Sequence, residues 1–366
     1  MRRWRLSPQH YRSICVAALL LLGLIVVTGA AVRLTGSGLG CDDWPNCNAS
    51  KFVDVSSRHS AIEQVNRLFT GLVSLVVIAA VLGSLIRTPR RRDLTLLSLG
   101  LVGGVIGQVV LGGVTVLVDL HPAAVQAHLL LSMALVANAV VLVSRAGMPD
   151  AMRRHRVSRS LRRHVWVCAA ATLVAITFGT VVTGAGPHAG DEEARRFSIS
   201  IGRAAELHGI AVWVAVGCVA TLMLRLRHRA AERAVLDGPL VLWICVAVAQ
   251  ASIGYLQYFT GVPAALVAAH VAGATVLWAA TVWLVEALAA PITPVTSLTG
   301  SARQALHELG SLVDDGREET ADFTYEVPER VGAATGVAPE RDQQEQHQHG
   351  EAQLLHGFER HGTTSN

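Results

Sequence analysis

The sequence predicts an all-α integral membrane protein, in which eight transmembrane helices form two tandem four-helix bundles related by a pseudo-twofold axis along the membrane normal. Three observations lead to this prediction. The chain is 51% hydrophobic, with a mean hydropathy of +0.43. Apolar spans of about 20 residues, the length that crosses the hydrocarbon core of a bilayer, recur along it. The two halves of the chain also repeat each other at a fixed offset.

The apolar spans define the expected helices. The first span is too long for the apolar region of a cleavable signal peptide, and we expect it to remain as a transmembrane helix. In chain order the spans cover residues 14–34, 65–86, 94–118, 124–144, 164–184, 205–224, 239–259 and 264–286.

Arginine distribution predicts the orientation of these helices. Arginines lie in the N-terminal segment and in the loops after the second, fourth and sixth spans, whereas the alternate loops are poorer in arginine and carry acids. Because positive loops stay in the cytoplasm, both termini are expected there, with the chain crossing the plasma membrane repeatedly. The net charge of +4 is then a topology signal, and the expected partner is the lipid bilayer and not a nucleic acid.

The same pattern divides the chain into five parts. A cytoplasmic N-terminus is followed by two four-helix halves joined by an Arg-rich cytoplasmic linker. The last part is acidic and polar, and we expect it to be a disordered cytoplasmic tail. The predicted boundaries are 1–13, 14–144, 145–163, 164–287 and 288–366.

The internal repeat relates polar residues of the two halves. Asn66 lies 142 residues before His208, and His128 lies 142 residues before His270. The flanking sequences agree, since residues 107–128 match residues 249–270. Four crossings return the chain to its starting side, so the halves share one topology and are expected to be parallel repeats.

Apart from His164, at the first residue of the fifth span, three of the fifteen histidines lie inside spans, namely His128, His208 and His270. Each lies just past the outer start of an even-numbered span, so the three share one depth in the outer leaflet. Ionisable residues inside a membrane indicate function. Two neutral imidazoles on facing helices are suited to bind one haem iron axially, which makes His208 and His270 candidate ligands of a haem in the second half. A zinc or non-haem iron site is the alternative, but it requires further carboxylates or thiols.

The first half departs from this symmetry because Asn66 occupies the position equivalent to His208. Asparagine is a poor iron ligand, so two interpretations stay open. Either a haem in this half has His128 as its single axial ligand, or His59 substitutes for the missing histidine. His59 would reach the site only if the second helix extended two turns towards the N-terminus, which would place it on the face of Glu63 and Asn66.

The first outer loop contains a cysteine pair, Cys41 and Cys47. Two thiols six residues apart on the oxidising side of the membrane predict a disulfide. A redox-active pair, or a metal site completed by Asp42, Asp43 or His59, is the alternative interpretation.

Together these motifs resemble the haem A synthase family over about residues 14–286. The segment VRLTGSGLGCDDWPNC (32–47) is similar to the family's first outer loop, and EQVNR (63–67) is similar to its Glu-x-x-His-Arg motif with Asn66 at the histidine position. The intramembrane histidines fall where the other haem-ligating histidines of the family are expected. The arginine- and alanine-rich composition indicates an actinobacterial-type member.

The resemblance implies a membrane haem-dependent oxidoreductase that oxidises a ring methyl group of haem O to a formyl group by successive hydroxylation, giving haem A. Haem b would be held in the second half, and the substrate haem in the first half near His128, Arg67, Asn66 and, as the weaker candidate, His59. Glu63 would be catalytic, as a proton acceptor or by stabilising positive charge at the methyl carbon. The implied partners are a haem O-producing farnesyltransferase upstream, cytochrome oxidase assembly downstream, and an electron donor that the sequence does not identify.

Simpler interpretations accompany these roles. Glu63 and Arg67 lie at positions i and i+4 and would also form an ordinary ion pair at the mouth of a helix, while Arg67 alone would suit a haem propionate. The rival functions are a di-haem b-type membrane electron-transfer protein and, less favoured, a haem or quinol transporter.

Overall fold

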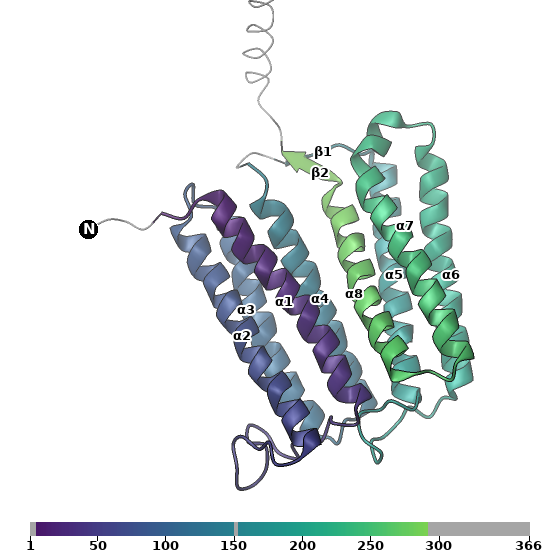
Figure 1. Ribbon diagram of the computed structural model, residues 1–366. Coiled ribbons are helices and arrows are strands. Elements are labelled where there is room, and N and C mark those ends of the chain that lie inside the picture. The colour runs from purple at the N-terminus through teal and green to yellow at the C-terminus, as the bar shows by residue number, and fades with distance from the viewer. Residues whose placement is uncertain (1–4, 150–152, 292–366) are drawn as a thin grey trace, which may run out of the picture. The chain divides into compact units, whose positions relative to one another are not determined.

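The computed structural model describes residues 5–149 and 153–291, which contain eight long helices (Figure 1). Each helix is long and apolar enough to cross a membrane. The prediction of a multi-pass helical membrane protein is thereby confirmed. The helices are α1 (Pro8–Leu34), α2 (Arg58–Ile86), α3 (Arg92–Leu117), α4 (Pro122–Ala146), α5 (Arg159–Ala185), α6 (Ile201–Leu226), α7 (Ala230–Phe259) and α8 (Ala264–Glu286).

Most helices extend beyond the apolar spans that predict them. α2 begins at Arg58 and not at residue 65, because Ser57 and Ser60 form a capping box that satisfies backbone donors at its polar start. α7 begins at Ala230 and passes through Pro239, where the span had been expected to start. Hydropathy detects only the part of a helix that lies in hydrocarbon, so it does not detect the polar turns at either end.

One pair of strands was not expected. The two strands β1 (Arg153–His155) and β2 (Ala289–Pro291) pair in antiparallel register, with His155 opposite Ala289. These six residues add a short strand pair to the helical fold, since backbone pairing between the loop after α4 and the chain after α8 depends on the fold and not on local pattern. The rest of the expected cytoplasmic tail, residues 292–366, lies outside the described residues.

The helices pack in two sets that follow chain order. α1 and α3 each contact α2 and α4 in the first set, and α8 contacts α5 and α7 in the second, where α6 lies mainly against α5. Each set has its own core of buried leucines, represented by Leu101 and Leu142 in the first and by Leu161 and Leu222 in the second. This arrangement supports a division into four-helix halves.

The sets meet along α8, which contacts both α4 and α1, and α4 also contacts α5. The α4–α8 contact joins two histidine-bearing helices. Within this contact the indole Nε1 of Trp278 donates a hydrogen bond to the Met133 carbonyl at 2.8 Å. At the Arg-rich end Arg145 pairs with Glu286, with 3.4 Å between Nη2 and Oε1. Because α4 carries His128 and α8 carries His270, this contact fixes the relative position of the two histidine-bearing helices.

A second connection joins the sets at the opposite end. The guanidinium of Arg33, at the end of α1, donates from Nε to the Ala189 carbonyl at 3.0 Å and from Nη2 to the Thr183 carbonyl at 3.3 Å. The Gly38 amide donates to the Gly190 carbonyl at 2.9 Å. Gly190 has φ of 109°, a conformation that favours glycine. The α1–α2 and α5–α6 loops are therefore joined directly.

Candidate functional site

The second half brings together two imidazoles from different helices. His208 on α6 and His270 on α8 have ring centroids 6.3 Å apart, with their planes at 81°. Metal–imidazole bonds of about 2.0 Å place two rings on opposite sides of one ion with centroids about 6 Å apart. Rotation about the metal–nitrogen bonds leaves the angle between the ring planes free. The pair therefore has the separation that an axially bound iron requires.

Hydrogen bonding orients the His208 ring for this role. Its Nδ1 lies 2.9 Å from the carbonyl oxygen of Ala175 on α5. A carbonyl only accepts, so Nδ1 carries the proton and Nε2 keeps its lone pair. A carbonyl partner of this kind fixes the tautomer of metal-binding histidines. On His270, Nδ1 is buried and has no hydrogen-bond partner within the described residues.

Each intramembrane histidine packs on a glycine of the preceding helix. A Cβ built on Gly112 or Gly179 would lie 3.2 Å from Cε1 of His128 or His208 respectively. A Cβ on Gly254 would lie 3.4 Å from Cε1 of His270. The three rings thus occupy space that any larger residue would fill. The matched positions of Gly112 and Gly254 in the repeat contained this signal, but sequence reasoning did not assign the glycines a role.

Repeat-related glutamines add a second shared feature. The Gln108 side chain donates from Nε2 to the His128 carbonyl at 3.1 Å, and Gln250 donates to the His270 carbonyl at 3.0 Å. Both glutamines lie 20 residues before their histidine. The two halves therefore fix the backbone at the histidine in the same way, which supports the repeat as a structural relationship.

The donor set limits the group that His208 and His270 could hold. No cluster of three or more His, Cys, Asp or Glu residues with metal-binding geometry occurs in residues 5–149 and 153–291. Two imidazoles alone leave a zinc or non-haem iron ion short of ligands. They suffice for the iron of a haem, whose remaining positions are filled by the porphyrin. The residues therefore fit a haem better than a bare metal ion.

In the first half the predicted site residues have different partners. Asn66 donates from Nδ2 to Thr28 Oγ1 at 2.9 Å, so its amide is turned towards α1. His59 is on α2, as the extended-helix interpretation requires, but it is exposed and its Nδ1 lies 3.0 Å from Ser37 Oγ. His128 is half-buried on α4, and its Nδ1 has no hydrogen-bond partner within the described residues. The structure does not draw these three side chains into one ligand set.

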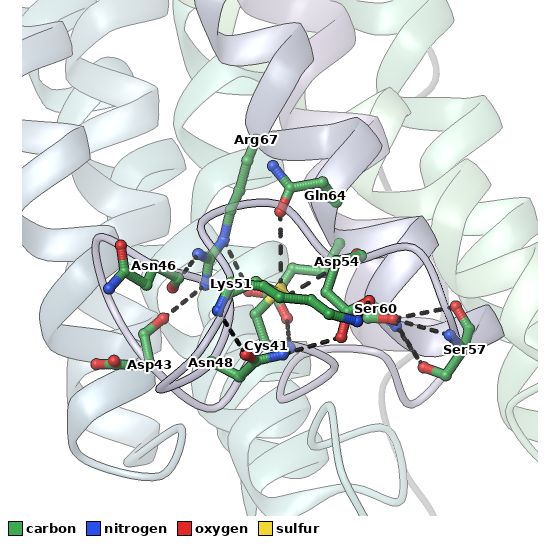
Figure 2. Close-up of a disulfide and its surroundings, with 12 residues drawn as sticks. Cys41, Asp43, Asn46, Asn48, Lys51, Asp54, Ser57, Ser60, Gln64 and Arg67 are labelled. Atoms are coloured by element: carbon green, nitrogen blue, oxygen red, sulfur yellow. Dashed lines mark hydrogen bonds and ion pairs between the residues drawn. A yellow bond between two sulfur atoms is a disulfide. The ribbon is translucent and has the colours of Figure 1, made fainter.

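Glu63 and Arg67 form an ion pair that also binds the α1–α2 loop. Figure 2 shows Arg67 extending towards Asp43 and Asn46 of this loop. One carboxylate oxygen of Glu63 accepts from Arg67 Nη2 at 2.7 Å and Nε at 3.1 Å, and the other accepts from the Cys41 amide at 2.8 Å. Arg67 also donates to the carbonyls of Asn46 at 3.0 Å and Asp43 at 3.3 Å. Glu63 is only 7% exposed. In this structure the pair holds the loop against the N-terminal end of α2.

The predicted disulfide between Cys41 and Cys47 is formed and is buried. Its cysteines flank Trp44, whose indole lies 2.6 Å from the place where a Cβ on Gly113 of α3 would stand. The loop thus reaches across from α2 to α3, and Gly113 provides the space for the Trp44 ring. Whether the disulfide also exchanges stays a prediction.

The carboxylate of Asp54 organises the rest of this loop. It accepts from the Ser56 amide at 3.1 Å and from Asn48 Nδ2 at 2.9 Å, and it pairs with Lys51 at 3.4 Å. The hydrogen bonds from Ser56, aided by Lys51, lower the pKa of Asp54. This contribution to the folded loop is therefore present above the unfolded pKa of an aspartate and is lost as pH falls through the lowered value.

Comparison with known proteins identifies two relatives and a family. Over 161 residues the chain is 27% identical to a heme A synthase of Exiguobacterium sp., an overlap of 43% of this chain and 53% of that protein. Over 113 residues it is 34% identical to a heme A synthase of Lysinibacillus sphaericus, an overlap of 30% of this chain and 37% of that protein. The matched region thus spans about half the length of the first relative. The family model described as cytochrome oxidase assembly protein matches residues 12–282, which include all eight helices apart from a few terminal residues. The chain belongs to the cytochrome oxidase assembly protein family.

Proposed function

We propose that this protein is a haem A synthase, a membrane oxidoreductase that converts the ring methyl group of haem O into the formyl group of haem A. The observation that carries the proposal is the His208–His270 pair, whose 6.3 Å separation suits an axially bound iron. Family membership supports it, as do the two relatives named heme A synthase.

In this proposal the second half holds a resident haem b on His208 and His270. Bound there, the haem supplies one-electron redox chemistry. The protein orients the ligand rings: Ala175 holds the tautomer of His208, and Gly179 and Gly254 leave room for the two imidazoles.

The first half would bind haem O as substrate, with His128 as the axial ligand. Because the Asn66 amide is bonded to Thr28, the opposite axial position would have no histidine, and His59 would have to leave Ser37 to supply one. This favours the interpretation with a single axial ligand.

Glu63 would accept a proton or stabilise positive charge at the reacting methyl carbon. Its buried carboxylate accepts hydrogen bonds from Arg67 and from the Cys41 amide. The same contacts fix its position, so it would act without reorganisation. Arg67 is bonded to Glu63 and to two loop carbonyls, which favours a positioning role over binding of a propionate.

The setting of the reaction follows from the arginine distribution and the family. The protein would cross the plasma membrane with both termini in the cytoplasm, its halves related by an axis along the membrane normal, and its histidines in the outer leaflet. A farnesyltransferase that makes haem O would act before it, cytochrome oxidase assembly would use its product, and a separate donor would supply electrons.

Haem extraction tests the proposal. The protein is purified from a host that supplies haem O, and the extracted haems are separated by chromatography. We expect haem B together with haem O, a hydroxylated product or haem A. Haem B alone, whatever the supply of haem O, would contradict the proposal and would favour the di-haem electron-transfer protein.

A further inference from the structure

A hollow of about 490 Å³ lies between α5 and α6 at their Arg-rich ends. It is remote from the histidine pair and from the loop that contains the disulfide, and the proposed reaction does not use it. Three arginines line it, Arg159 and Arg163 from α5 and Arg225 from α6, together with Ser160 and His164. Three guanidinium groups around one concave surface favour the binding of an anion.

The arginines of this hollow have no acidic partner among the described residues. Nearby Arg229 and Arg233 form ion pairs with Glu232 and Asp237. Arg159, Arg163 and Arg225 form no ion pair with any described residue. The positive-inside rule accounts for arginines at this end of the helices, but it does not require three of them to converge uncompensated on one hollow.

Arg225 is oriented by neutral groups only. Its Nη1 donates to Nδ1 of His164 at 2.8 Å, and its Nη2 donates to Ser160 Oγ at 2.6 Å. Because Nδ1 of His164 accepts, Nε2 carries the ring proton and bonds the Cys218 carbonyl at 3.0 Å. The guanidinium therefore keeps several N–H groups for a ligand, and the His164 ring and Ser160 hold it in place.

The rim of the hollow is apolar and exposed. Val167, which lines it, is 53% exposed, and Trp166, the preceding residue of α5, is 60% exposed and lines an adjacent hollow that shares Arg159 and Arg163. Tryptophan at this position on a membrane helix is typical of the headgroup level. An occupant would therefore meet arginines at one end and an apolar helix surface at the other.

We propose that this hollow binds the phosphate of an anionic phospholipid, with the guanidinium groups of Arg159, Arg163 and Arg225 around the phosphate and an acyl chain along Val167 and Trp166. Guanidinium groups match phosphate oxygens in geometry and charge. Basic pockets between transmembrane helices on the cytoplasmic side are known to bind lipid headgroups. A soluble phosphate shares the headgroup chemistry but would make no use of the apolar rim.

Native mass spectrometry of the full chain in detergent tests this proposal. The protein is titrated with phosphatidylglycerol, with phosphatidylcholine of the same acyl chains, and with inorganic phosphate as a competitor. We expect one phosphatidylglycerol to be retained in preference to phosphatidylcholine and to resist millimolar phosphate. Displacement of the lipid by phosphate would show that the anion alone is recognised and would overturn the lipid assignment.

A matched pair of double variants separates a built site from general surface charge. The R159Q/R163Q variant removes two exposed arginines of the hollow, and R90Q/R92Q removes two exposed arginines at the same end of the α2–α3 region. Arg92 and Arg159 are each the first residue of a helix. We expect R159Q/R163Q to weaken phosphatidylglycerol retention about tenfold or more and R90Q/R92Q to weaken it less than about threefold.

Equal losses in the two double variants would overturn the proposal, because lipid retention would then depend only on the overall positive charge of this face. The His164→Gln variant gives a third measurement, since it loosens Arg225 without changing the charge, and we expect weaker retention there too. Circular dichroism of each variant checks that helix content is unchanged.

Discussion

At the scale of single residues, the Glu63 carboxylate binds two partners at once. One oxygen bonds the Cys41 amide and the other bonds Arg67, so removal of either partner also disturbs the loop. The sequence predicted the Glu63–Arg67 pair from its helical spacing. It did not predict the bonds to Cys41, Asp43 and Asn46, because the path of a loop across a helix mouth leaves no local pattern.

Glu63→Gln separates the chemical role from the structural one. The amide keeps an oxygen that can accept from Cys41 but loses the charge. If Glu63 takes part in the reaction, we expect haem O conversion to fall about 100-fold or more, with the content of haem B unchanged. Turnover by chromatography and haem B by its absorption spectrum provide the two readouts.

Arg67→Gln is the companion variant. It leaves the Glu63–Cys41 bond in place but removes the donors to Asp43 and Asn46, so we expect faster proteolysis of the loop and a smaller loss of activity than in E63Q. Conversion within about twofold of the wild type in E63Q would dispose of the catalytic role of Glu63.

The histidines give a second prediction at this scale. His208→Ala and His270→Ala each remove one of two facing imidazoles, so we expect each variant to lose most of its haem B on purification. His128→Ala lies at the same depth in the other half and serves as the control, with haem B retained. Loss of haem B in all three variants alike would place the resident haem elsewhere.

At the scale of elements, the helices themselves were predictable and their contacts were not. Hydropathy identifies α8 at its full length, because its apolar span and its helix coincide. It does not show that Gly179 on α5 faces His208 on α6, because the relative rotation of two apolar helices depends on packing. The repeat did preserve one such contact, through Gly112 and Gly254, and was the one route from sequence to these positions.

Gly179→Ala tests whether this close contact positions the ligand ring. The added methyl group would stand 3.2 Å from Cε1 of His208 and 3.5 Å from its Nδ1, so the imidazole must move by a few tenths of an ångström. We expect a shifted haem absorption band and an altered midpoint potential, with haem B still bound. Gly217→Ala, on α6 with no atom within 4 Å of the new methyl group, is the control and should leave both unchanged. Identical spectra for the two variants would contradict a positioning role.

At the scale of the whole molecule, the halves are joined at both ends and in the middle. Sequence reasoning proposed two four-helix halves but not what fastens them. The residues that do so, such as Arg33 and Trp278, lie on elements far apart in the chain and bond to backbone carbonyls, which any residue could supply. No sequence pattern marks an acceptor of that kind.

Arg33→Gln tests the connection at the loop end. It removes two charge-assisted hydrogen bonds to the α5–α6 region, and we expect the thermal midpoint to fall by about 5 °C. Hydrogen exchange in residues 186–200 should also become faster. Arg203→Gln is the control, because Arg203 forms an exposed ion pair with Glu206 and its loss should cost little. A similar fall in both variants would show that Arg33 does not join the halves.

The contact between α4 and α8 has a kinetic consequence. Because these helices carry His128 and His270 and are held together by Trp278 and by Arg145, the gap between the two histidine positions is a constant of the fold. An electron that tunnels from one position to the other would cross the same thickness of protein at every turnover, whatever the state of the outer loop. Its rate would then vary with driving force and reorganisation energy and not with distance, and a substitution that separates α4 from α8 would slow it without touching His128 or His270.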